Sequence, residues 1–113
     1  MYASNMYDKH TLIKQNEVIM YNKLSKYRTT WTDRTDGCGS VVYVHTPIVS
    51  WDNESITLRS DGWETVTTKK KMNQSANQFG LNFTVFQENH EWFVCTPKGE
   101  TVDFLDGMKI NRV

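Results

Sequence analysis

The fold prediction starts from residues 62–74, which read Gly62-Trp63-Glu64-Thr65-Val66-Thr67-Thr68-Lys69-Lys70-Lys71-Met72-Asn73-Gln74. On a helix with 3.6 residues per turn, continued past this stretch, one stripe carries Thr65, Thr68, Met72, Ala76 and Phe79. The opposite face carries Thr67, Lys70, Lys71, Gln74, Asn77 and Gln78. The pattern therefore predicts an amphipathic helix from about residue 65 to 78, with one face on the core and the other in solvent.

The residues beside this helix indicate where it starts and stops. Asp61, with Glu64 three residues later, resembles a capping box, and Gly80 is placed for a left-handed C-terminal cap. We expect Trp63 to pack against a sheet as a hydrophobic staple, and base stacking is the alternative role for its ring.

Short β-branched and aromatic runs lie on both sides of the helix. Before it, strand character appears at residues 27–32, 41–44, 48–51 and 55–60, and Pro47 indicates an edge or a bulge. After it, strand character appears at residues 81–86, 91–96 and 100–105. This order predicts an α+β fold, a single antiparallel sheet of about five strands with one amphipathic helix packed across it.

The predicted domain organisation divides the chain near residue 40. Residues 1–40 are interpreted as an N-terminal arm of undecided helix or strand character, and residues 41–113 as a compact α+β domain. In that domain we expect the helix to bury Met72, Ala76 and Phe79 against four side chains from the strands, namely Leu58, Phe83, Val85 and Phe93.

Composition restricts the classes of partner. The 13 basic and 13 acidic side chains cancel, so only a local patch can attract an anionic partner. No apolar run approaches the ~18 residues that a membrane span needs, and the first twenty residues contain no signal-peptide core. These features predict an intracellular protein without a membrane partner.

Catalytic and metal-binding motifs find little support. His45 and His90 are not spaced to join a nucleophile, and Cys38 and Cys95 form no Cys-x-x-Cys unit. The pair Asp103 and Asp106 follows no cation-binding loop pattern and is better explained as a solvated turn. We therefore expect no metal and no cofactor, and the sequence favours binding over enzyme activity.

The predicted helix carries the clearest candidate binding site. No acidic residue lies between Glu64 and Glu88, while lysines, amides and hydroxyls that can contact phosphate, sugar or bases are concentrated there. The helix N-terminus also favours negative charge. The candidate binding residues are Thr65, Thr67, Thr68, Lys69, Lys70, Lys71, Asn73, Gln74 and Asn77, and the alternative is a solvated face that only keeps the protein soluble.

The motif Gly-Trp-x-Thr-x-Thr-Thr-Lys-x-x-Met-Asn-Gln at residues 62–74 resembles a group of small proteins carried by tailed bacteriophages. The runs at residues 78–81, 86–87, 92–94 and 106–108 extend the resemblance, which covers roughly residues 41–110. It implies a viral origin and a compact fold, and it transfers no catalytic residue. For a viral protein, the intracellular location predicted above is the host cytoplasm.

Three functions follow as hypotheses. The first is a phage accessory protein whose basic helix binds nucleic acid, or a host complex that handles nucleic acid or acts in defence. The second is a nucleotide-binding or phosphate-binding protein or small enzyme, with the phosphate near residues 65–68. The third is a virion structural or assembly protein that uses its aromatic residues in a homo-oligomer interface.

Overall fold

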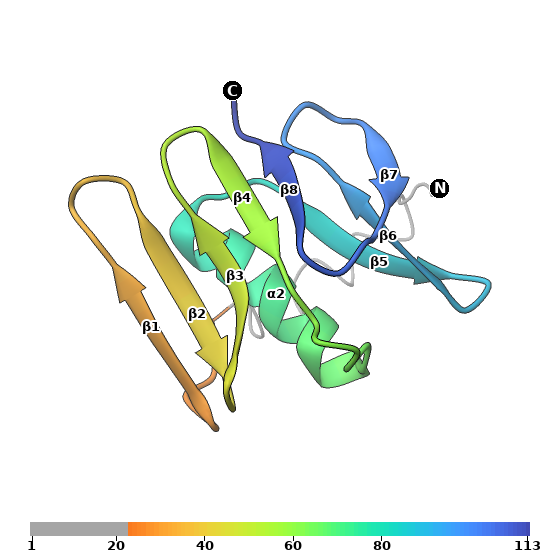
Figure 1. Cartoon of the computed structure of the whole chain (residues 1–113), viewed down its shortest axis with the longest axis horizontal. Coiled ribbons are helices and arrows are strands. Elements are labelled where there is room, and N and C mark those ends of the chain that lie inside the picture. Colours follow the sequence, from red (N-terminus) through yellow and green to blue (C-terminus); the bar gives the residue numbers. More distant parts are fainter. Residues whose placement is uncertain (1–22) are drawn as a thin grey trace.

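The structure is a computed structural model that describes residues 23–113, and in that range it contains one helix and eight strands. The helix, α2, spans Val66–Phe79 and separates two groups of strands in the chain (Figure 1). The strands are β1 Thr29–Asp33, β2 Gly39–Tyr43, β3 Thr46–Trp51, β4 Ser55–Leu58, β5 Thr84–Glu88, β6 Glu91–Cys95, β7 Thr101–Asp103 and β8 Met108–Asn111.

The strands form two antiparallel sheets, so the α+β class is right and the prediction of a single sheet is wrong. The larger sheet has the order β1-β2-β3-β4-β8, and the smaller has the order β5-β6-β7. The reason lies in β8, which pairs with β4 through Ile56 and Ile110 and so occupies the edge that the strands after α2 would need. No strand was predicted at the four residues of β8.

The larger sheet includes residues that lie before residue 41, where the predicted compact domain begins. Strand β1 confirms the strand character predicted at residues 27–32, and together with the start of β2 it brings residues 29–33, 39 and 40 into the sheet. The register between β2 and β3 shifts between Val41 and Val42, beside Pro47, which confirms the bulge that this proline indicated. Predictions about residues 1–22 of the N-terminal arm lie outside the described residues.

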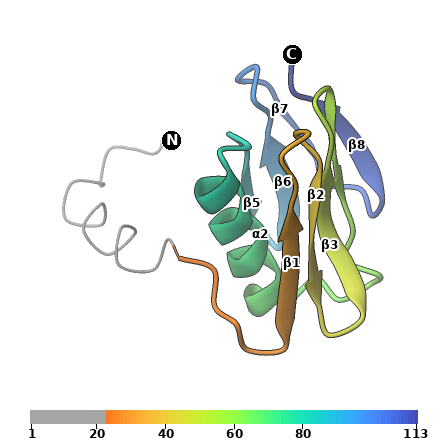
Figure 2. The same cartoon turned by 90° about the vertical axis from the view of Figure 1, so that its left-hand side faces the viewer.

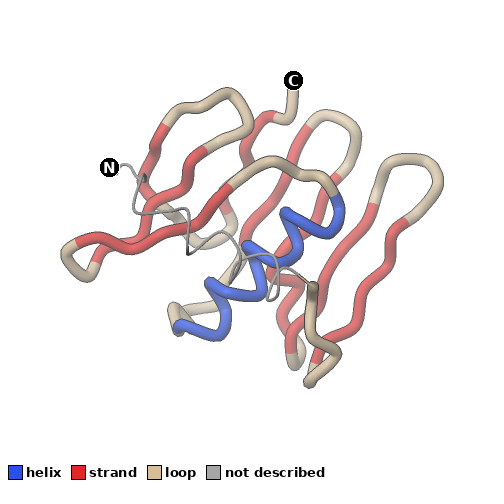
Figure 3. Tube along the Cα trace, turned by 180° about the vertical axis from the view of Figure 1, so that it is seen from behind, coloured by secondary structure: helices blue, strands red, loops and turns tan. Residues whose placement is uncertain are grey.

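Helix α2 crosses one face of the five-stranded sheet (Figures 2 and 3). Met72 and Ala76 are buried there as predicted, in one core with Leu58, Phe83 and Val85. Phe79 is only half-buried and packs elsewhere than expected, stacked on Trp51 at 5.0 Å between ring centroids and edge-on to Trp31 at 6.4 Å. Phe93 stacks instead on Phe86 across β5 and β6, at 5.6 Å.

The C-terminal cap of α2 is the predicted one, and the N-terminal cap is not. Gly80 forms the predicted left-handed cap, with φ 65° and its N–H donating to the Ala76 carbonyl. At the start, the N-cap is Thr65, whose hydroxyl accepts a 3.1 Å hydrogen bond from the Thr68 N–H. The Asp61 carboxylate accepts a hydrogen bond from the Thr46 hydroxyl instead, so the predicted capping box is wrong.

Candidate functional site

The segment of residues 23–28, Lys-Leu-Ser-Lys-Tyr-Arg, runs beside α2. Leu24 anchors it, because its side chain is buried in the core and its N–H donates to Gln78 Oε1 at 2.9 Å. One residue on, the Ser25 carbonyl accepts a hydrogen bond from Lys71 Nζ at 3.2 Å. These contacts bring Lys23 of the segment next to Lys70 and Lys71 of the helix.

Between the segment and the helix lies a hollow of about 320 Å³, which we call the lysine hollow. Its lining residues are Lys23, Ser25, Tyr27, Thr67, Lys70, Lys71 and Gln74. Of these seven described residues, three carry ammonium groups, three carry hydroxyls, one carries an amide and none carries a carboxylate. Such a lining offers hydrogen-bond donors and positive charge to an anion.

Lys71 is the most enclosed of these lysines, with 4% of its surface exposed. Its ammonium lies 5.2 Å from the centre of the Tyr43 ring, a cation–π distance. Burial, and after it the charge of Lys70, lowers the pKa of Lys71. The prediction that Lys71 and Gln74 face solvent is therefore wrong, because helical periodicity cannot reveal that residues 23–28 cross that side of the helix.

Two other predicted binding residues turn toward β5. Lys69 Nζ lies 3.4 Å from Gln87 Oε1, and burial lowers the pKa of this lysine. The Asn73 amide donates to the Val85 carbonyl at 2.9 Å and accepts from the Val85 N–H at 2.7 Å. Asn77 is exposed near the C-terminal end of α2. None of these three lines the lysine hollow, so the nine candidate residues do not form one continuous site.

Thr65 and Thr68 line a second cavity, of about 410 Å³, which we call the tryptophan pocket. The other lining residues are Arg28, Tyr43, Val44, His45, Thr46, Ile48, Ser60 and Trp63. Trp63 is 69% exposed, so the expectation of a staple against the sheet is wrong. Asp61 and Gly62 both adopt left-handed backbone, with φ 51° and 83°, and turn the chain just before the indole.

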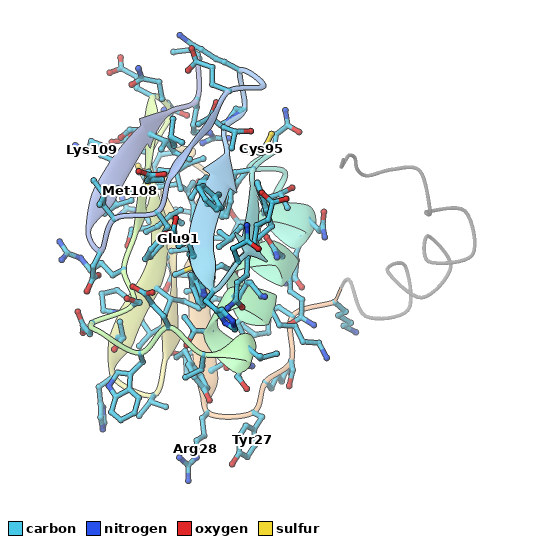
Figure 4. The ribbon with its side chains drawn as sticks, turned by 90° about the vertical axis from the view of Figure 1, so that its right-hand side faces the viewer. Tyr27, Arg28, Glu91, Cys95, Met108 and Lys109 are labelled. Carbon is cyan, nitrogen blue, oxygen red and sulfur yellow. The ribbon has the colours of Figure 1, made fainter. Side chains whose placement is uncertain are left out.

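The two hollows share a wall. Tyr43 lines the tryptophan pocket and carries on its ring face the ammonium of Lys71, which lines the lysine hollow. Arg28 lines the tryptophan pocket, and its guanidinium lies 5.5 Å from the ring centre of its neighbour Tyr27, which lines the lysine hollow. Figure 4 shows Tyr27 and Arg28 projecting from the same lower end of the molecule, far from Lys109.

The sequence prediction missed the part of the site that lies before residue 29. Lys23, Lys26 and Arg28 place three basic residues within six positions, around the exposed Tyr27. That basic run with an aromatic residue inside it was a usable signal. Its position beside α2 was not visible, because the contact joins residues 46 positions apart.

Other classes of site find no support in the described part of the chain. Residues 23–113 hold no cluster of three or more His, Cys, Asp or Glu side chains that could bind a metal ion. Cys38 and Cys95 are both free thiols. Across the same residues, no helix is long and apolar enough to cross a membrane.

Comparison with known protein families identifies the family of the chain. The model of the family described as "Kyanoviridae Gp96 protein" matches residues 9–111, so the chain belongs to this family. The match confirms the expectation of a tailed-phage protein family. No curated protein and no solved structure matched the chain.

Proposed function

We propose that this member of the Kyanoviridae Gp96 family is a phage accessory protein that binds nucleic acid in the host cytoplasm, and that the lysine hollow holds the phosphate backbone. The observation that carries the proposal is the convergence of Lys23 with Lys70 and Lys71, from segments far apart in sequence, in a hollow whose described lining has no carboxylate. In a chain of zero net charge, such a local concentration is what could attract a polyanion.

The surroundings of the hollow support the same proposal. Lys26 and Arg28 lie on the segment that forms one of its walls. Both also line a neighbouring shallow depression that includes His45. Hydroxyls and amides beside the lysines are common phosphate and sugar contacts. The exposed ring of Tyr27 offers an aromatic surface within the basic segment.

The alternative of a free-nucleotide site at the start of α2 has less support. The Thr65 hydroxyl already accepts the Thr68 N–H and donates to the Thr68 hydroxyl at 3.1 Å. The helix terminus therefore satisfies part of its own hydrogen-bonding capacity. An anionic surface of a host protein complex is a partner that the same lysines could also bind, and the experiment below separates the two.

The test is a titration of duplex and single-stranded DNA and of RNA by fluorescence anisotropy at several salt concentrations. Two exposed lysines on phosphates, Lys23 and Lys70, predict a log–log salt slope of about −2 on duplex DNA. The variant Lys23→Glu/Lys70→Glu should weaken binding to all sequences and reduce the size of the slope by about 2. Lys71 is left unchanged, because its burial would make a charge reversal a test of folding rather than of binding.

The matched control is Lys98→Glu/Lys109→Glu, which makes the same change of net charge at two exposed lysines outside both hollows. Lys98 lies in the loop between β6 and β7, at the opposite end of the molecule from the start of α2 (Figure 1). Equal losses in both variants would show that net charge, not a site, governs binding. If the wild type binds no nucleic acid at low salt, the proposal is wrong, and a nuclease-treated pull-down from infected cells then tests the host complex.

A further inference from the structure

We infer that the tryptophan pocket takes one unstacked base of a single-stranded nucleic acid, with the indole of Trp63 as its stacking surface. The inference rests on the proposed function and adds the class of ligand, a single strand rather than a duplex. It starts from a cavity of about 410 Å³, within the size range of ordinary small-ligand pockets, at the end of the molecule where α2 begins.

Large apolar side chains are unusually exposed around this pocket. Trp63 is 69% exposed and Val44 is 46% exposed, and both line the cavity. Val66, 71% exposed, directly follows the lining residue Thr65, and Tyr27, 65% exposed, precedes the lining residue Arg28. Exposed aromatic rings beside cationic side chains are the elements with which proteins bind single strands, since every base has a face that can stack.

The turn that carries Val44 adds a second observation. Val44 and His45 connect the paired residues Tyr43 and Thr46, and Val44 has φ 60°, which is strongly disfavoured for a β-branched residue. A hydrogen bond of 2.8 Å from the Val44 N–H to the Arg28 carbonyl holds this conformation. Strain of this kind is concentrated at ligand sites, and here it keeps an apolar side chain at the rim of the pocket.

The interior of the pocket offers polar groups that suit a base edge. Ser60 and Thr68 line the cavity with 1% and 2% of their surface exposed. Their hydroxyl oxygens accept hydrogen bonds from the Gly62 N–H at 3.3 Å and from the Thr65 hydroxyl at 3.1 Å, and a hydroxyl that accepts one bond can still donate another. Arg28 and His45 add donors to the same lining. The pocket therefore combines a stacking surface, apolar walls and hydrogen-bonding groups of both kinds.

The position of the pocket selects a single strand. Because Tyr43 and Lys71 form its common wall with the lysine hollow, a phosphate in the hollow and a base in the pocket can belong to one continuous strand. In a duplex the bases are paired and stacked inside, so they cannot reach Trp63 without being unpaired at a cost in free energy. Duplex binding would then use the lysines alone.

The test compares wild type with Trp63→Ala on an oligothymidylate of about 16 nucleotides and on a duplex of the same length. Loss of one stacked base should weaken binding to the single strand by roughly 5- to 100-fold and leave binding to the duplex unchanged. Trp63→Phe should retain most of the affinity. Leu105→Ala is the matched control, since Leu105 is 65% exposed and lines neither hollow.

A fluorescence readout tests the contact itself. Trp51 and Trp92 are buried, and Trp31 is half-buried and packed edge-on to Phe79, whereas Trp63 is exposed. Stacking on Trp63 should therefore quench the fluorescence of the wild type and not that of Trp63→Phe. The inference is overturned if Trp63→Ala binds the oligothymidylate as tightly as wild type, or loses single-strand and duplex binding equally. If the lysine reversal still weakens binding in that case, the proposed function stands without a base pocket. Failure of the wild type to bind any nucleic acid would overturn both.

Discussion

The two ends of helix α2 use aromatic side chains in opposite ways. At the C-terminal end, Phe79 stacks on Trp51, whose ring is 7% exposed, and the Gly80 cap closes the last turn. At the N-terminal end, Trp63 and Val66 are 69% and 71% exposed. Burying the indole would contribute stability, so its exposure is a cost that packing does not explain. The difference indicates that the aromatic residues at the C-terminal end stabilise the fold. Those at the N-terminal end are the better candidates for contact with a partner.

The largest test of this contrast removes volume from the buried face of α2 and from its exposed N-terminal end. Met72→Ala deletes a fully buried side chain and should lower the free energy of unfolding by about 2–5 kcal/mol. Val66→Ala, on the same helix, should change it by less than about 0.5 kcal/mol, because Val66 is in solvent. Urea denaturation followed by circular dichroism measures both. Similar losses would show that the N-terminal end also contributes to the core.

An intermediate effect is expected at Asn73, which holds the helix to β5. Asn73→Ala removes two hydrogen bonds and leaves the N–H and carbonyl of Val85 without these partners. We expect a loss of about 1–3 kcal/mol in unfolding free energy. Nucleic-acid affinity should not change, since Asn73 lines neither hollow. A loss of nucleic-acid affinity in the folded variant would show that the binding surface also includes the side of α2 that faces β5.

A smaller effect than at Met72 or Asn73 is expected at Asp106, whose carboxylate holds the connection before α2 in place. Its carboxylate accepts hydrogen bonds from the N–H groups of Ser60 at 2.9 Å and Gly62 at 3.2 Å. Burial alone would raise its pKa, but the backbone donors of Ser60, Asp61 and Gly62 outweigh this and hold the pKa of Asp106 below its usual value. Since Asp106 is exposed, we expect Asp106→Asn to cost about 1 kcal/mol near neutral pH.

The sign of the pH dependence follows from the lowered pKa. An unfolded Asp has a pKa of about 3.9 and binds more protons than the folded one in the window below that value. The stabilisation by Asp106 is therefore complete above about pH 4 and is lost as the pH falls through the folded pKa. Urea unfolding of wild type and Asp106→Asn should give a difference that shrinks in acid. If the difference in unfolding free energy stayed the same at all pH values, the charge of Asp106 would not be its source.

The sequence predicted the parts of the fold that depend on local patterns. The bounds of α2, the Gly80 cap, the burial of Met72 and Ala76 and the bulge at Pro47 all follow from spacing and residue type. What it could not predict depends on contacts between distant residues. The pairing of β8 with β4 divided the strands into two sheets, and no local pattern indicates which edge a four-residue strand will occupy.

The candidate site shows the same limit. Four of the nine predicted residues, Thr67, Lys70, Lys71 and Gln74, line the lysine hollow. The helical wheel placed Lys71 in solvent, because it treats every residue outside the apolar stripe as exposed. It could not show that Ser25 and Tyr43 enclose the ammonium. The Asp106 turn looked like a solvated loop for a related reason, since its hydrogen-bond partners lie 44 and 46 positions away.

The contact between Asn73 and Val85 also has a consequence for association between chains. Strand β5 is at an edge of the three-stranded sheet, and an edge strand exposes backbone groups on which another chain can add a strand. At Val85 the amide of Asn73 occupies both the N–H and the carbonyl, as a neighbouring strand would. The helix thus blocks this edge at Val85, near the start of β5, with one side chain, and a second copy of the protein would find no backbone partner at that residue.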